Sequence, residues 1–157
     1  DPIIWANDNQ ITGDTLYLFV KNKKPEQLYV FENAFAINKI DTTSYYNQLK
    51  GNKLNVFFEE GEIHKMSAKG NAENVYFPLD NDKYFIGVNH SNAQIIEVYF
   101  ENTEPAKVVF KNQLIGKMTP LNKTPKEELI IKGFKWQESL RPKSKYELMK
   151  LPSLNRP

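Results

Sequence analysis

The chain is predicted to be all-β, with an antiparallel sheet that folds over on itself as a jelly-roll or sandwich. Three observations predict this. Apolar and polar residues alternate over most of the chain, turn-forming residues separate the alternating runs, and glycines recur inside those runs. A period of two is typical of strands, and a glycine inside a strand marks a bulge or a bend. We expect at least ten antiparallel strands before residue 120.

The strands are expected where β-branched and aromatic residues alternate. The clearest runs are residues 16–21, 28–31, 54–58, 96–100 and 107–111. Asn, Asp, Gly and Pro favour turns, because they adopt turn conformations or bond to their own backbone. Such residues separate the strands at 22–26, 59–62, 79–83 and 101–105. Bends are expected at Gly13, Gly51, Gly70 and Gly116.

Part of the sequence repeats. The octapeptide 9–16 (NQITGDTL) returns 38 residues later as 47–54 (NQLKGNKL), and Asn33-Ala34 returns as Asn71-Ala72 with the same offset. A partial third copy lies at 112–116 (NQLIG). A constant offset over 25 residues indicates one structural unit used twice, because stacked repeats share a core that no single copy can bury.

The C-terminal part has a different pattern. Thr124-Pro125-Lys126-Glu127 predicts a helix start, with threonine as the N-cap and proline at the first helical position. This helix would reach about Ile131, and residues 141–148 suggest a second short helix. We therefore expect two parts: a β-jelly-roll over 1–118, and a C-terminal tail with short helices over 119–157.

Composition excludes several classes of function. A net charge of +2 is too small to indicate nucleic-acid binding, and no apolar run approaches the ~20 residues that cross a bilayer. The absence of cysteine excludes disulfides and thiolate chemistry. The chain opens with a strand-like segment at Asp1-Pro2-Ile3. We therefore expect a mature or excised segment whose targeting sequence is not in this chain.

No catalytic or metal site is predicted. His64 and His90 are far apart in the sequence and match no ligand motif. Asp80 and Asp82 flank Asn81, but the glycine and distal glutamate of a calcium loop are missing, so a polar turn is the better interpretation. A second acidic group, Glu59, Glu60 and Glu62, could form a carboxylate pair, but it surrounds a turn glycine and is expected to face water. The prediction is a protein that is not an enzyme and needs no cofactor.

Two other polar groups have alternative interpretations. Asn9, Asn47 and Asn112 are either polar ligands or strand-end residues that cap backbone groups at a bend, and their repetition favours the second. The tail carries a local positive charge that either meets phosphate groups or forms a solvated face, and the second is preferred. Its basic residues are Lys132, Lys135, Arg141, Lys143 and Lys145.

The repeat resembles that of the OstA-like family. This family includes the periplasmic bridge of lipopolysaccharide transport and the periplasmic domain of its outer-membrane translocon. Its pattern is a glycine, a strand, a turn with glycine, a strand, and then Gly-Asn-Ala or Gly-Asn-Val. The second copy matches this pattern well, in the segments 47–54 (NQLKGNKL), 57–63 (FFEEGEI) and 68–72 (AKGNA).

The match is uneven along the chain. In the first copy the turn is Lys23-Lys24-Pro25, and Glu32 stands where Gly70 would be; the third copy is looser. The resemblance covers about residues 3–118. In the tail, residues 134–136 together with 141–143 resemble the end of a module in large OstA-like proteins.

The resemblance implies a β-jelly-roll that is open along one side, located in the periplasm. Its apolar interior would shelter the acyl chains of lipopolysaccharide or another multi-acyl lipid, and modules would stack through exposed edge strands into a continuous groove. Burial of acyl chains stabilises by ~0.8 kcal/mol per CH₂. The residues expected to line this groove are Leu16, Leu18, Val30, Leu54, Val56, Ile63, Val75, Ile96 and Val98.

The same residues would also form a closed sandwich core. The leading hypothesis is therefore a non-enzymatic lipid-binding or bridge module of lipopolysaccharide transport, with other OstA-like modules or transport components as partners. The alternative is a scaffold or assembly domain of outer-membrane biogenesis that holds no lipid.

Overall fold

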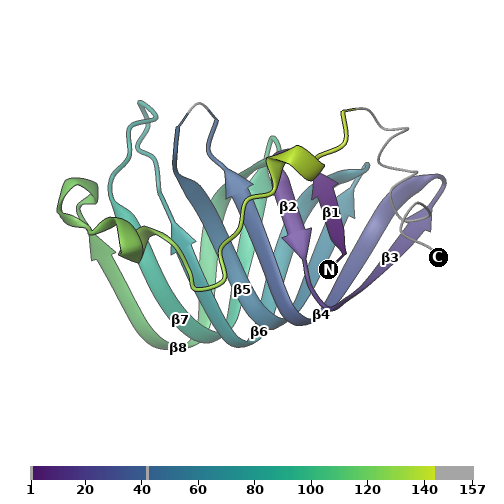
Figure 1. Cartoon of the computed structure of the whole chain (residues 1–157), viewed down its shortest axis with the longest axis horizontal. Coiled ribbons are helices and arrows are strands. Elements are labelled where there is room, and N and C mark those ends of the chain that lie inside the picture. Colours follow the sequence, from purple (N-terminus) through teal and green to yellow (C-terminus); the bar gives the residue numbers. More distant parts are fainter. Residues whose placement is uncertain (1, 42, 144–157) are drawn as a thin grey trace.

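The computed structural model describes residues 2–41 and 43–143, which form one open antiparallel sheet of eight strands (Figure 1). The strand order is β1-β2-β4-β5-β6-β7-β8, and β3 pairs with the other half of β4. The strands are β1 Ile3–Ala6, β2 Asn9–Thr12, β3 Thr15–Lys21, β4 Lys24–Lys39, β5 Tyr46–Glu59, β6 Glu62–Tyr76, β7 Val88–Glu101 and β8 Glu104–Thr119. The predicted all-β class is confirmed.

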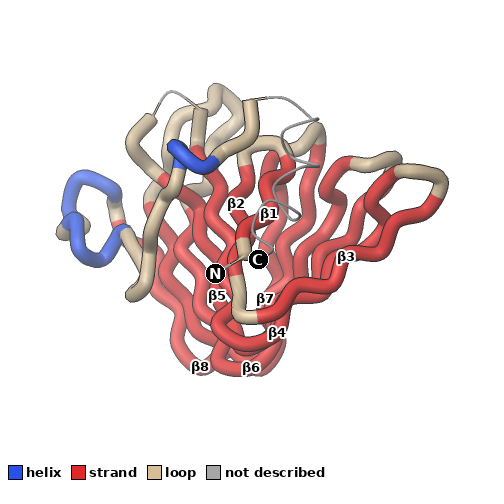
Figure 2. The backbone as a smooth tube through the Cα atoms, turned by 45° about the vertical axis from the view of Figure 1, so that its right-hand side comes forward, coloured by secondary structure: helices blue, strands red, loops and turns tan. Residues whose placement is uncertain are grey.

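The sheet folds over into two layers because its five longest strands all bend near their middles (Figures 1 and 2). The first layer contains β1, β2 and residues 34–39, 46–51, 72–76, 88–93 and 113–119. The second layer contains β3 and residues 24–31, 53–59, 62–69, 95–101 and 104–111. No described strand closes the sheet, so β1 and β3 form one edge and β8 forms the other.

The bend has a common backbone origin in neighbouring strands. The pairing register shifts between Phe31 and Ala34, between Lys50 and Lys53, and between Lys69 and Ala72. Left-handed residues lie in the first and third of these intervals, at Glu32 (φ 63°), Asn33 (φ 53°), Gly70 (φ 81°) and Asn71 (φ 49°). A bulge bends its strand, and aligned bulges bend the whole sheet.

The number of strands differs from the prediction. The structure has eight strands before residue 120, not ten or more, because the chain passes through the bends without ending its strands. The predicted turns are confirmed between β3 and β4, β5 and β6, and β7 and β8. Bends at Gly51 and Gly70 are confirmed. The bend predicted at Gly116 is not found, because Gly116 pairs regularly with Ser91. The bend of β8 lies instead near Asn112, which is left-handed (φ 54°).

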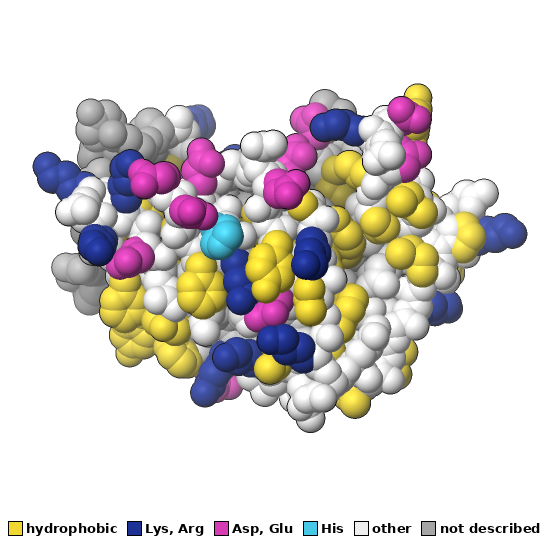
Figure 3. Space-filling model, turned by 180° about the vertical axis from the view of Figure 1, so that it is seen from behind, with side chains coloured by type: hydrophobic (Ala, Val, Ile, Leu, Met, Phe, Trp, Pro, Cys, Tyr) yellow, Lys and Arg dark blue, Asp and Glu magenta, His cyan; other side chains and the backbone are white. Residues whose placement is uncertain are grey.

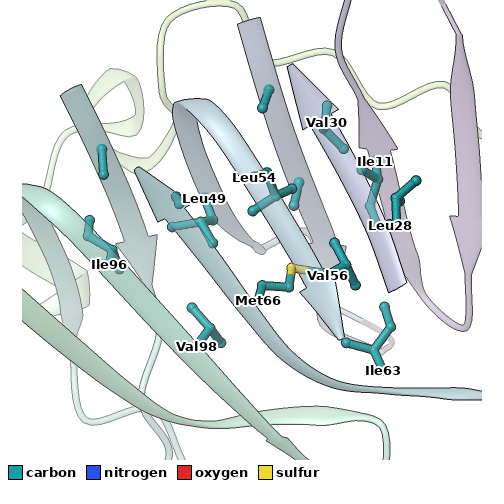
Figure 4. Packing of buried hydrophobic residues seen from close by; sticks show 14 of the residues in the cluster. Ile11, Leu28, Val30, Leu49, Leu54, Val56, Ile63, Met66, Ile96 and Val98 are labelled. Carbon is teal, nitrogen blue, oxygen red and sulfur yellow. The ribbon is translucent and has the colours of Figure 1, made fainter. Parts of the chain in front are cut away.

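Two apolar clusters stabilise the fold. One lies between the layers and is built from side chains of both, including Ile11, Leu28, Leu54, Met66 and Ile96 (Figure 4). The other lies on the outer surface of the first layer, around Phe35, Ile37, Val75, Phe77 and Val88. The tail covers this second cluster and contributes Ile131, whose side chain is fully buried, together with half-buried Phe134 and Trp136.

The described tail contains no α-helix. It has three short 3₁₀ turns, η1 Leu121–Lys123, η2 Lys126–Leu129 and η3 Glu138–Leu140, joined by extended chain. The prediction of a helix from Thr124 to Ile131 is therefore wrong as to length and type. The Thr124 hydroxyl does not cap η2; it donates to the carbonyl of Pro120 at 2.8 Å. Ile131 packs in the outer cluster, and an extended tail brings it to that position. The second predicted helix, 141–148, lies mostly outside the described residues.

Two buried glutamines of the first layer hold the tail against the sheet. The Gln48 amide donates to the Leu129 carbonyl (2.8 Å) and accepts from the Ile131 N–H (2.7 Å). The Gln10 amide donates to the Lys135 carbonyl (2.8 Å) and accepts from the Gln137 N–H (2.7 Å). At the far end, Arg141 donates to the Asn7 carbonyl (2.6 Å) and pairs with Asp8 (3.1 Å). The described part of the tail is thus an integral part of the fold.

Candidate functional site

The space between the two layers is the candidate site, because most of the predicted groove residues meet there. Six of the nine belong to the interlayer cluster and are 0–6% exposed: Val30, Leu54, Val56, Ile63, Ile96 and Val98. Leu16 packs against this cluster and is half-buried. Figure 4 shows the labelled side chains of both layers pointing into this one space.

Two predicted groove residues lie elsewhere. Val75 is fully buried, but it belongs to the outer cluster beneath the tail. Leu18 is 46% exposed. It pairs with Leu28 in the register and so faces inward, but β3 projects beyond the first layer and leaves it uncovered (Figure 2).

The side chains of the two layers fill the space between them. One cavity in this space, next to its mouth, has a volume of about 20 Å³, close to the room of one water molecule, and Leu49, Met66, Val98 and Phe100 are among the residues that line it. In this conformation the interior is a packed core, and acyl chains would enter only if the layers separated.

A larger cleft opens at the mouth of this space. It has a volume of about 610 Å³ and lies between the loop after β4, the loop between β6 and β7, and the β7–β8 turn. Asn38, Asn47, Tyr76 and Pro105 line both cavities, so the cleft adjoins the packed interior. The Tyr76 hydroxyl donates to the Pro105 carbonyl at 3.5 Å and joins the two layers there. Burial raises the pKa of Tyr76, so this hydroxyl stays protonated.

A row of asparagines crosses the first layer beside this cleft. The Asn38 amide donates to the Asn9 side chain (3.1 Å), and the Asn47 amide donates to that of Asn38 (3.3 Å). Asn47 also accepts from the backbone N–H of Phe77 at 2.9 Å. Asn9 donates to the Ala6 carbonyl (3.1 Å), so both residues bond to backbone groups near strand ends, as the structural interpretation expects, but neither lies at the bend of the sheet. Asn112 occupies a different position, at the bend of β8, and donates to Gln94 at 2.8 Å.

The remaining polar candidates make local contacts. His64 pairs with Glu59 (3.3 Å), and His90 with Glu73 (2.7 Å). The Asp80 carboxylate accepts from the backbone N–H groups of Asp82 and Tyr84, both at 2.9 Å, which is the geometry of a polar turn. Within residues 2–41 and 43–143, no group of three or more metal-ligating side chains lies together. No helix in that part of the chain is long and apolar enough to cross a membrane.

Of the basic tail residues, Arg141 has a structural role. It pairs with Asp8 and Glu138 and lies 5.6 Å from the Trp5 ring centre. Lys132 and Lys135 are exposed, and Lys145 lies outside the described residues.

Comparison of the chain with family models, with curated proteins and with solved structures finds no match.

Proposed function

We propose that this chain is a non-enzymatic module of a lipopolysaccharide-transport bridge in the periplasm, with the open-sided jelly-roll architecture and internal repeat of the OstA-like family. It joins neighbouring modules through its edge strands and shelters acyl chains between its two layers. The proposal unites the resemblance of residues 3–118 with the folded, open sheet.

One observation carries the proposal: the apolar surface between the layers reaches both edges of the sheet. The interlayer cluster is continued by Ile4 on β1 and Leu16 on β3 at one edge, and by Val108 and Phe110 on β8 at the other. In a β-sandwich that functions as a single module, the apolar interior is expected to be buried away from the open edges of the sheet. Here the same surface would continue into the next module if edges paired.

The edges themselves support this proposal. β3 carries exposed Leu18, Phe19 and Val20, and β8 carries exposed Leu114, Ile115 and Met118. Each of these strands pairs on one side only. Edges with free backbone groups and apolar side chains favour association with another strand, and monomeric proteins usually protect them.

Loading with lipid requires the layers to separate, because the interior is packed. The bend along the middle of the sheet supplies a hinge line, and the Tyr76–Pro105 hydrogen bond at the mouth must break for the layers to open. Acyl chains would then replace side-chain contacts by contacts of the same apolar kind.

Photo-crosslinking tests this function. A small diazirine amino acid is placed at position 56 or 98 between the layers, or at exposed position 117 as the outward control, and each variant is mixed with lipopolysaccharide. The proposal expects lipid adducts at 56 and 98 and few at 117.

The packed interior favours one alternative, a scaffold that associates through its edges and holds no lipid. Absence of adducts at 56 and 98, with an unchanged circular dichroism spectrum, would establish that alternative. Adducts at equal levels at all three positions would indicate non-specific contact with lipid.

A further inference from the structure

The outer face of the second layer is a second surface with its own chemistry. Across β4 to β8 its outward positions form rows, in which Gln27, Phe57, Lys65, Tyr99 and Lys107 lie side by side in register. The row nearest the bend contains Phe31, Lys53, Lys69, Ile95 and Lys111. No described segment covers this face, whereas the tail covers the outer face of the first layer (Figures 1 and 3).

The lysine face, defined as Lys53, Lys65, Lys69, Lys107 and Lys111 with the rings around them, is strongly basic. Glu97 is the single carboxylate in its rows, so the face has a formal charge of +4, although the whole chain has only +2. Glu97 is 8% exposed and pairs with Lys65 (3.1 Å) and Lys111 (3.4 Å). Among the described residues, Lys53, Lys69 and Lys107 have no carboxylate within ion-pair distance.

Three aromatic rings on this face, those of Phe31, Phe57 and Tyr99, lie beneath lysine ammonium groups. The Lys53 ammonium is 5.9 Å from the Phe31 ring centre, and that of Lys107 is 5.5 Å from the Tyr99 ring centre. Lys65 lies over both Phe57 (5.6 Å) and Tyr99 (5.3 Å). On neighbouring β3, Tyr17 and Phe19 are about half exposed and extend the same face. Nucleic-acid bases need free ring faces for stacking, and ammonium groups occupy the faces of Phe31, Phe57 and Tyr99.

The shape of the face indicates a flat partner. None of the five lysines lines the cavity between the layers or the cleft at its mouth. The face spans five strands, which at the usual strand spacing is about 20 Å. Several separate ammonium groups on a flat face can each bind one anionic group of a planar surface. The Tyr and Phe rings beside them favour an apolar region next to those anionic groups.

We propose that the lysine face docks the protein on the surface of a membrane that carries anionic phospholipids. The ammonium groups meet lipid phosphates, and Tyr17 and Phe19 reach the level of the headgroups, where aromatic side chains are favoured. This surface is distinct from the space between the layers, so it does not require acyl chains to enter the protein.

Flotation with vesicles tests this proposal. The protein is mixed with vesicles of phosphatidylcholine containing phosphatidylglycerol, or of phosphatidylcholine alone. We expect binding to the anionic vesicles only, and loss of binding as salt screens the charges. The triple variant Lys53→Gln, Lys69→Gln, Lys107→Gln should bind about 100-fold more weakly, because each lysine at an anionic surface contributes about 1 kcal/mol and 1.4 kcal/mol is tenfold.

The matched control is Lys117→Gln, Lys123→Gln, Lys126→Gln. It removes the same charge from exposed positions on β8 and the tail, and it should bind like the wild type. Equal losses in both triple variants, or no binding of the wild type to anionic vesicles, would overturn the proposal. So would wild-type binding to a single-stranded oligonucleotide without binding to vesicles. Adducts at positions 56 and 98 should not change in the lysine variant, which separates this result from the test of lipid carriage.

Discussion

Gln10 and Gln48 bind the tail with the same geometry, although 38 residues separate them in the chain. Each side-chain amide donates to one tail carbonyl and accepts from the N–H two residues later, at 129 and 131 for Gln48 and at 135 and 137 for Gln10. Both glutamines are at most 2% exposed. The first two copies of the Asn-Gln pair thus place equivalent clamps on neighbouring parts of the first layer, and these clamps fix an extended segment across the strands.

Replacing Gln48 by alanine should detach the tail. The change leaves the buried Ile131 N–H and the Leu129 carbonyl without partners, so we expect a loss of about 2–3 kcal/mol in the free energy of unfolding. Chemical denaturation measures the loss, and hydrogen exchange at residue 131 should accelerate. Gln113→Ala is the control, because Gln113 is exposed and makes only a 3.5 Å contact with Ser91. A similar loss in both variants would contradict the clamp.

The bulge residues Glu32 and Gly70, also 38 residues apart, should respond in opposite directions to substitution. Both are left-handed, at φ 63° and 81°. Glu32→Gly should stabilise by about 0.5–1 kcal/mol, because glycine adopts this conformation without strain. Gly70→Ala should destabilise by about 1–2 kcal/mol; its new Cβ would also lie 2.8 Å from the Asn52 side-chain nitrogen. Thermal melting compares the two, and a fall in stability for both would show that φ does not decide the effect.

The sequence predicted the parts of the fold that depend on local patterns. Alternation located the strands, and turn residues located the hairpins at 22–23, 60–61 and 102–103. The predicted number of strands was too high because a glycine inside an alternating run can either end a strand or bend it. Only the pairing on both sides of Gly51 and Gly70, in which β5 and β6 continue past these residues, decides between these outcomes.

The tail and the site were less predictable. A capping pattern at Thr124 predicts a helix from local preference, but Ile131, Phe134 and Trp136 gain more by packing on the sheet in an extended segment. Val75 alternates like the groove residues, and a period of two cannot tell the inner face of a folded sheet from an outer face that the tail covers. In the sequence, the lysines of the lysine face appear only as polar positions in alternating runs. They form rows only when strands that are distant in the sequence pair with one another.

The ion pairs of Glu97 should make stability depend on pH. Burial alone would raise the pKa of Glu97, but the hydrogen bond and charge of Lys65, together with the charge of Lys111, outweigh it and hold the pKa below the ordinary 4.5. Because the folded pKa is the lower one, the stabilisation is present above about pH 4.5 and is lost as the pH falls through the folded pKa. At the other end, the hydrogen bond to Glu97 raises the pKa of Lys65 above 10.5, so the same pair is lost when the pH rises beyond that value.

Glu97→Gln tests this dependence. We expect a loss of about 1–2 kcal/mol at neutral pH, between the values for exposed and fully buried pairs. The difference from the wild type should shrink in acid. Glu101→Gln, at an exposed position at the end of the same strand, should behave like the wild type throughout. A constant difference between Glu97→Gln and the wild type from acid to neutral pH would mean that packing, not charge, stabilises this position.

Edge pairing between copies should be head to tail, with the whole β8 edge of one copy against the β1 and β3 edge of the next, and should therefore produce open chains. Leu18→Lys with Val20→Lys places charges on the β3 edge, and Leu114→Lys with Ile115→Lys does so on β8; a charged edge resists pairing. All four positions are exposed, so the fold should survive. In sedimentation velocity the wild type should associate into a series of sizes, each double variant alone should be a monomer, and the two variants mixed should form a dimer and nothing larger. A β3 variant that dimerises alone would reveal pairing of β8 with β8, and wild type that stays monomeric at every concentration would remove the edge argument altogether.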